Sequence, residues 1–297
     1  MLKRFISISL AVVFAVSALV GCGGSGGSEA TKIAVGSKDF TESFILAELY
    51  ALALEKEGFE VERKFNLGGT NVTQPAMVEG DLDVYPEYTG TCLLNVLQED
   101  MMTDPQEVYD HVKSEYEEQF NLTLLNPAEA SNSQGLAISA AVSEKYNIKT
   151  ISDLQANASE VRFASQGAFE ENADGMPALI NTYGEFAFKS VEYFDNAIKY
   201  ELINNDEADL IIAFTTDGQL TDPSMVLLED DKKAWPPYNI VPVIRQDTLE
   251  KDEKIAEALN AVSAVLDNET MQKLNAEVDI NKREPEEVAK EFFDATF

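Results

Sequence analysis

The spacing of apolar and polar residues changes repeatedly along the first third of the chain. Residues 32–35 form a short apolar run, 39–58 repeat apolar residues at helical intervals, and 59–65 alternate apolar with charged residues. Asp39 followed by Glu42 has the form of a capping box, so the helix is expected to begin there. The pattern therefore predicts a strand, a helix and a second strand in succession.

The same alternation continues through the rest of the chain. Further strands are predicted at 82–85, 136–139, 162–164, 210–214 and 240–245, and further helices at 70–80, from 152, and at 176–183, 197–204, 254–266 and 285–293. Strands that alternate with helices at this spacing need crossover connections, which favour a mostly parallel sheet covered on both faces. The predicted fold class is α/β.

The order of these elements suggests two lobes, with the second inserted in the first. Residues 31–133 and 236–297 are assigned to lobe 1 and residues 134–235 to lobe 2, so the chain crosses between the lobes twice. Two such crossings form a hinge. Because ligand sites favour clefts at the carboxyl ends of strands, we expect the ligand to bind between the lobes.

The first 21 residues have the layout of a secretory signal. Lys3 and Arg4 precede an apolar run over 5–20, which is short of the ~20 residues that a membrane-spanning helix needs. The following Cys22 completes a site that resembles the bacterial lipobox, so Cys22 is the expected lipidation site. Residues 22–30 have the composition of a flexible Gly/Ser linker. We therefore expect an exported protein that is lipid-anchored to the extracytoplasmic face of the cell membrane.

Composition excludes several classes of function. The chain has 53 acidic and 22 basic residues and a formal charge of −31 at pH 7, which would repel a nucleic acid. With Cys22 lipidated, Cys92 is the single remaining cysteine and His111 is the single histidine, so neither a zinc site nor a Cys/His nucleophile is expected. We expect a monomer that has no metal, cofactor or catalytic residues and is not an enzyme.

Three segments resemble the quaternary-amine solute-binding proteins of ABC importers, which bind glycine betaine, choline, carnitine and similar compounds. They are Gly36–Glu42 (GSKDFTE), Leu67–Thr70 (LGGT) and Tyr85–Thr91 (YPEYTGT). Later segments agree in the same order, among them Asp174–Pro177, Phe214–Asp217 and Pro236–Tyr238. The resemblance covers the whole mature body. It implies a two-lobed periplasmic-binding-protein-like fold of type II, a quaternary-amine osmoprotectant as solute, and an ABC permease and its ATPase as partners.

The resemblance also implies an aromatic cage. A permanently methylated cation has no N–H donors and is held by the faces of aromatic rings instead. Tyr88, Tyr200 and Phe214 fall on cage positions of the family, and Lys38 and Thr91 match two positions that grip the ligand's carboxylate. The competing interpretation is that the aromatic residues are ordinary core residues and that Lys38 is a surface charge.

Two positions depart from the family pattern. Gln134 stands where betaine binders have a further cage tyrosine, and Asn172 stands where an arginine would clamp a carboxylate. Since asparagine supplies only neutral hydrogen bonds, the departures favour choline or a larger, less anionic amine over betaine or carnitine. A different amine solute with the same transport role, and a receptor lipoprotein without a transport role, are the alternatives.

Overall fold

The computed structural model describes residues 31–297, apart from the side chain of Asn196. The predicted signal at 1–21, the lipidation site Cys22 and the linker at 22–30 therefore lie outside the described residues. Within the described part of the chain, no helix is both long enough and apolar enough to cross a membrane.

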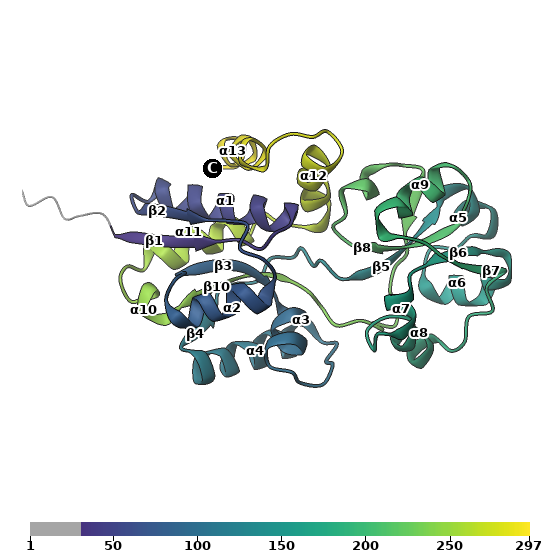
Figure 1. Ribbon diagram of the computed structural model, residues 1–297, viewed down its shortest axis with the longest axis horizontal. Coiled ribbons are helices and arrows are strands. Elements are labelled where there is room, and N and C mark those ends of the chain that lie inside the picture. The colour runs from purple at the N-terminus through teal and green to yellow at the C-terminus, as the bar shows by residue number, and fades with distance from the viewer. Residues whose placement is uncertain (1–30) are drawn as a thin grey trace, which may run out of the picture.

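The described chain forms two lobes, each built on one sheet (Figure 1). The strand order is β2-β1-β3-β10-β4 in lobe 1 and β7-β6-β8-β5-β9 in lobe 2. The strands of lobe 1 are β1 (Lys32–Gly36), β2 (Glu60–Lys64), β3 (Val84–Tyr88), β4 (Leu122–Leu124) and β10 (Ile240–Arg245). Those of lobe 2 are β5 (Gln134–Ser139), β6 (Arg162–Ser165), β7 (Ser190–Tyr193), β8 (Leu210–Phe214) and β9 (Met225–Leu227). The prediction of a two-lobed α/β fold is confirmed.

The sheets are mixed rather than mostly parallel, and in this respect the prediction was wrong. β1 is parallel to β2 and β3, and β6 is parallel to β7 and β8. In contrast, β10 is antiparallel to β3 and β4, and β5 is antiparallel to β8 and β9. Both β5 and β10 enter their lobe directly from the other lobe. Because no crossover helix precedes them within the lobe, they are not constrained to run parallel to their neighbours.

Helices cover both faces of each sheet, and the alternation of strand residues separates two cores in each lobe. In β3, for example, Val84 belongs to the core under α1 and Tyr85 belongs to the core under α4. The helices of lobe 1 are α1 (Thr41–Lys56), α2 (Thr70–Glu79), α3 (Thr89–Thr91), α4 (Pro105–Phe120), α10 (Gln246–Leu249), α11 (Lys254–Ser263), α12 (Asn268–Asp279) and α13 (Pro285–Thr296). Those of lobe 2 are α5 (Ala140–Tyr146), α6 (Ile151–Asn157), α7 (Gly167–Glu171), α8 (Met176–Tyr183) and α9 (Lys199–Asn204).

The capping-box prediction at the start of α1 is wrong. The helix begins one residue after Phe40, whose extended backbone takes the N-cap position without a side-chain hydrogen bond. The Glu42 carboxylate instead accepts hydrogen bonds from Tyr88 and Asn132, which lie far away in the sequence. The Glu42 side chain therefore makes tertiary hydrogen bonds and does not cap the helix.

The lobes are also joined by a packing contact, in addition to the two chain crossings. Helix α12 lies on the side of lobe 1 that faces lobe 2 (Figure 1), against the short turn η4 (Gly218–Thr221). The side chain of Asn275 donates to the carbonyl oxygen of Thr216 at 2.9 Å, and Gln272 donates to that of Thr215 at 2.8 Å. A Cβ atom at Gly218 would lie 2.5 Å from the backbone nitrogen of Ala276. The absence of a side chain at Gly218 therefore permits this close approach.

Candidate functional site

A cleft of about 600 Å³ lies between the lobes and is lined by side chains from both. Its aromatic lining comes from Phe40, Tyr88 and Tyr238 of lobe 1 and from Tyr200 and Phe214 of lobe 2. The carboxyl ends of β3 and β8 supply Tyr88 and Phe214. Apolar rings with a few polar groups between them are the usual lining of a small-molecule site.

Tyr88 is the centre of the lobe 1 wall. Its ring stacks against that of Phe40, with centroids 6.2 Å apart and planes inclined by 27°. Its hydroxyl donates to Glu42 Oε1 at 2.7 Å, and burial raises the pKa of that hydroxyl well above its ordinary value. Tyr88 is 5% exposed. The hydrogen bond and the stacking therefore hold the ring in one orientation.

Glu42 places a carboxylate beside this ring. Asn132 Nδ2 donates to Glu42 Oε1 at 2.9 Å and Asn275 Nδ2 donates to Oε2 at 2.8 Å, in addition to the Tyr88 hydroxyl. Burial raises the pKa of Glu42, although the hydrogen bonds that the carboxylate accepts oppose that shift. A cation bound in the cleft would favour the ionised form of Glu42 and would be attracted by it.

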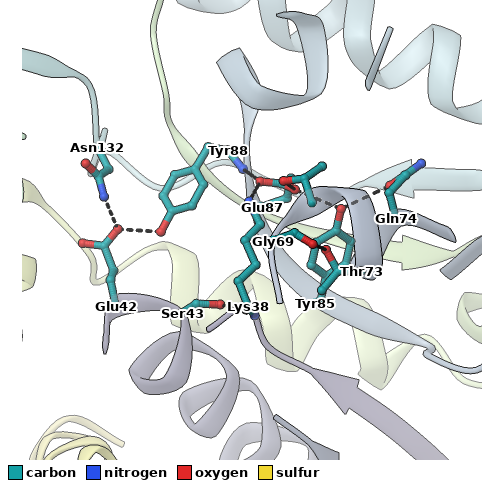
Figure 2. A network of polar contacts seen from close by, with 11 residues as sticks. Lys38, Glu42, Ser43, Gly69, Thr73, Gln74, Tyr85, Glu87, Tyr88 and Asn132 are labelled. Atoms are coloured by element: carbon teal, nitrogen blue, oxygen red, sulfur yellow. Dashed lines mark hydrogen bonds and ion pairs between the residues drawn. The ribbon is translucent and has the colours of Figure 1, made fainter. Parts of the chain in front are cut away.

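Lys38 extends toward Glu87 (Figure 2), and its ammonium lies 5.1 Å from the ring centroid of Tyr88. It is not among the residues that line the cleft. It is 5% exposed, and its ammonium forms an ion pair with the fully buried Glu87. Glu87 also accepts hydrogen bonds from Thr70, Tyr85 and the backbone N–H of Tyr88, each at 3.0 Å. A buried carboxylate needs a cationic partner, and this requirement keeps Lys38 away from the surface on which a ligand would lie.

The lobe 2 wall combines two aromatic rings with a charge pair. Lys199 Nζ lies 3.0 Å from Asp217 Oδ2, 5.0 Å from the ring centroid of Tyr200 and 5.3 Å from that of Phe214. Asp217 also accepts hydrogen bonds from the Tyr200 hydroxyl and, at 3.0 Å, from the backbone N–H of Phe214. Phe214 is 38% exposed, so this wall is more open than that of lobe 1.

The structure brings four of the seven predicted ligand-binding residues to the cleft and leaves three away from it. Tyr88, Thr91, Tyr200 and Phe214 line it. Lys38, Gln134 and Asn172 do not line it. Gln134 pairs with Phe214 between β5 and β8, and the exposed Asn172 follows the last residue of α7. The ligand-binding roles of these three residues stay predictions.

Sequence reasoning missed several lining residues. These are Phe40, Glu42, Asn132, Lys199, Asp217, Tyr238 and Asn275. Four of them, Phe40, Glu42, Asp217 and Tyr238, lie inside segments that carry the family resemblance. Their location inside these segments was the sequence signal that could have identified them as lining residues. Burial also raises the pKa of the Tyr238 hydroxyl, to about 12.

The family of the chain follows from comparison with known proteins. The model of a family described as the substrate binding domain of the ABC-type glycine betaine transport system matches residues 31–295. The chain belongs to this family. Its members are substrate-binding proteins of transport systems and not enzymes. The cleft between the lobes is therefore the candidate site for the transported substrate.

Individual relatives bind different amines. The chain is 33% identical over 267 residues to the ergothioneine transport permease/ergothioneine binding protein EgtU of Helicobacter pylori; the match covers 90% of this chain and 48% of EgtU. The chain thus spans about half the length of that relative. It is 31% identical over 298 residues to the carnitine transport binding protein OpuCC of Listeria monocytogenes, covering 98% of this chain and 96% of OpuCC.

The fold has solved counterparts. The crystal structure of a glycine betaine/carnitine/choline ABC transporter superposes with a TM-score of 0.84 at 24% identity and covers 89% of this chain and 98% of its own. At this level of identity the likeness supports the two-lobed fold and does not identify a ligand.

Proposed function

We propose that the chain is the extracytoplasmic substrate-binding lipoprotein of an ABC importer. In this proposal it captures a quaternary-amine osmoprotectant of the choline or glycine betaine type and delivers it to a membrane permease. One observation carries the proposal: five aromatic side chains from both lobes line one cleft beside the Glu42 carboxylate. Each aromatic face contributes ~0.5 to 2 kcal/mol to the binding of a methylated cation from which water is excluded.

Transport would use the two-lobed architecture. The open protein binds solute, the lobes close about the crossings near 131–134 and 235–239, and the closed form docks on the permease and its ATPase. Lipidation at Cys22 would keep the monomer close to that permease, with residues 22–30 as a flexible tether. Closure would bring the aromatic walls of the two lobes onto opposite sides of one solute.

A larger methylated amine is the second candidate. The relative from Helicobacter pylori is named for ergothioneine, and a cleft of about 600 Å³ has room for a solute larger than choline. A receptor lipoprotein with no transport role is a further alternative. It would contact another protein and carry no solute, so that no amine would raise its Tm.

The proposal is tested by thermal unfolding with matched ligand pairs. Choline is compared with ethanolamine, glycine betaine with glycine, and ergothioneine with histidine, and carnitine is added as a separate sample. A ligand at 100 times its Kd stabilises the folded state by about 2.7 kcal/mol, so a true ligand must raise the Tm. We expect a higher Tm with at least one methylated member and a smaller change with its unmethylated partner. The proposal is rejected if no methylated amine shifts the Tm.

A further inference from the structure

Lys199 is the single lysine or arginine among the described residues that line the cleft. It is the first residue of α9 and is 8% exposed. The other basic residue considered for the site, Lys38, is paired with Glu87 and does not line the cleft. Any anionic group of a ligand that enters the cleft therefore has one cationic side chain to meet.

The Asp217 carboxylate holds the ammonium of Lys199 in place. Asp217 is itself fixed by the Tyr200 hydroxyl and by the backbone N–H of Phe214. A lysine ammonium carries three donors, and the described hydrogen bond to Asp217, at 3.0 Å, takes one of them. The ammonium is thus positioned at the cleft with donor capacity left for a second anion.

The position of Lys199 also decides where the ligand's cation can lie. Its ammonium already lies within cation–π range of the rings of Tyr200 and Phe214. A second cation against the same rings would be repelled by it. On the opposite wall, the Lys38 ammonium lies 5.1 Å from the ring centroid of Tyr88 and is paired with Glu87, and the Tyr88 hydroxyl donates to a second carboxylate, that of Glu42. Glu42 leaves the lobe 1 wall with more carboxylates than ammonium groups, whereas on the lobe 2 wall Lys199 is matched by Asp217. A cation is therefore attracted more strongly to the lobe 1 wall.

We propose that Lys199 is a specificity-determining residue that binds the carboxylate of a zwitterionic methylated amine. The inference rests on the proposed function. The ligand then lies across the cleft, with its trimethylammonium group against Phe40 and Tyr88 of lobe 1 and its carboxylate against Lys199 of lobe 2. Lys199 supplies the positive charge that Asn172 lacks, and the preferred ligands are betaines rather than choline.

The test measures the affinities of glycine betaine and choline by isothermal titration calorimetry for wild type, Lys199→Met and Lys199→Arg. Both ligands carry a trimethylammonium group, and only glycine betaine carries a carboxylate. We expect Lys199→Met to weaken glycine betaine by about tenfold or more, which corresponds to the loss of a hydrogen bond between charged groups. Choline should change by less than about threefold or bind more tightly, and Lys199→Arg should retain most of the affinity for glycine betaine.

Two further variants separate this role from others. Lys199→Met combined with Asp217→Asn removes both charges, and it should still weaken glycine betaine more than choline, so that repulsion from an unpaired Asp217 is not the cause. Lys145→Met removes an exposed lysine of α5 and should change neither affinity. Retained binding of choline serves as the check that each variant is folded.

The remaining outcomes overturn the inference. Equal weakening of both ligands would make Lys199 structural, and stronger binding of both would make its ammonium an obstacle in the cage. Unchanged affinities, or a wild-type protein that binds choline but not glycine betaine, would also reject the inference and leave the proposed function intact. A wild-type protein that binds no methylated amine rejects both.

Discussion

The two walls of the cleft differ in how firmly they are held. On the lobe 1 wall, Tyr88 is 5% exposed, its hydroxyl is bonded to Glu42, and the ammonium of the Lys38–Glu87 pair lies near its ring. On the lobe 2 wall, Phe214 is 38% exposed beside Lys199. A site whose groups are fixed before binding loses less entropy when the ligand arrives. In the proposed function, the lobe 1 wall would receive the cation first and the lobe 2 wall would complete the site on closure.

The largest expected effect follows from breaking the ion pair that supports the lobe 1 wall. Glu87→Gln leaves Lys38 as a buried cation without an anion, and removing one partner of a buried pair destabilises a protein by about 3 to 5 kcal/mol. Urea denaturation measures this change. The double variant Glu87→Gln with Lys38→Met removes both charges and should recover a large part of the loss. A single variant as stable as wild type would contradict the supporting role of the pair.

The second largest effect is expected from disturbing the contact between α12 of lobe 1 and η4 of lobe 2. Gly218→Ala places a Cβ atom 2.5 Å from the backbone nitrogen of Ala276, so η4 has to move away from α12. Overpacking of this kind costs about 1 to 3 kcal/mol of stability, and the movement should separate the lobes and weaken solute binding. Small-angle scattering reports the separation. Gly167→Ala is the matched control, because a Cβ atom there meets nothing within 4 Å. An unchanged radius of gyration would exclude a spacing role for Gly218.

A direct comparison of the aromatic walls comes third. Tyr88→Ala should weaken choline by about 1 to 2 kcal/mol, whereas Phe214→Ala should cost about 0.5 kcal/mol, because the ring of Phe214 is more exposed and less of the water around a bound cation is excluded there. Calorimetric titration measures both. Tyr88→Phe keeps the ring and removes the hydrogen bond to Glu42, and it separates the two contributions of Tyr88. Equal losses in the two alanine variants would show that the walls hold the cation equally.

The sequence predicted the aromatic lining of the cleft better than the polar groups around it. Tyr88, Tyr200 and Phe214 were assigned through segments that resemble a known family, and the structure brings all three to one cleft. Glu42 fitted a local capping motif, and nothing local reveals that Asn132 and Asn275, distant in sequence, donate to its carboxylate instead. The reversed direction of β5 and β10 was missed for a similar reason, because it depends on where the chain crosses between lobes.

The surroundings of the Lys199 ammonium could not be predicted from the sequence either. Its neighbour Tyr200 was predicted to line the site, but the order of two residues on a helix does not reveal that the ammonium would lie within cation–π range of both lobe 2 rings. Only the fold brings Asp217 close enough to fix it there. Sequence patterns therefore predicted many of the elements, although they missed α4, α12 and the strands β4, β7 and β9. The pairing of charged groups across elements depends on the fold and was not predicted.

The smallest expected effect concerns pH. Burial raises the pKa of Glu42, so the folded protein holds this proton at pH values where the unfolded chain has released it. The stability that Glu42 contributes is therefore present at low pH and decreases as the pH rises from the ordinary glutamate pKa toward the raised value. Choline has no titrating group near neutral pH and should bind the ionised form more tightly. Its affinity should rise with pH by less than tenfold per pH unit.

Calorimetric titration of choline between about pH 4 and about pH 8 measures this dependence. Glu42→Gln removes the titrating carboxylate at nearly constant volume, and the difference between its profile and that of wild type isolates Glu42 from the other acidic residues of the cleft, Asp217 and Asp279. Parallel profiles would mean that Glu42 orients Tyr88 without attracting the cation. A rise confined to wild type would instead assign the electrostatic preference of the lobe 1 wall to this one carboxylate.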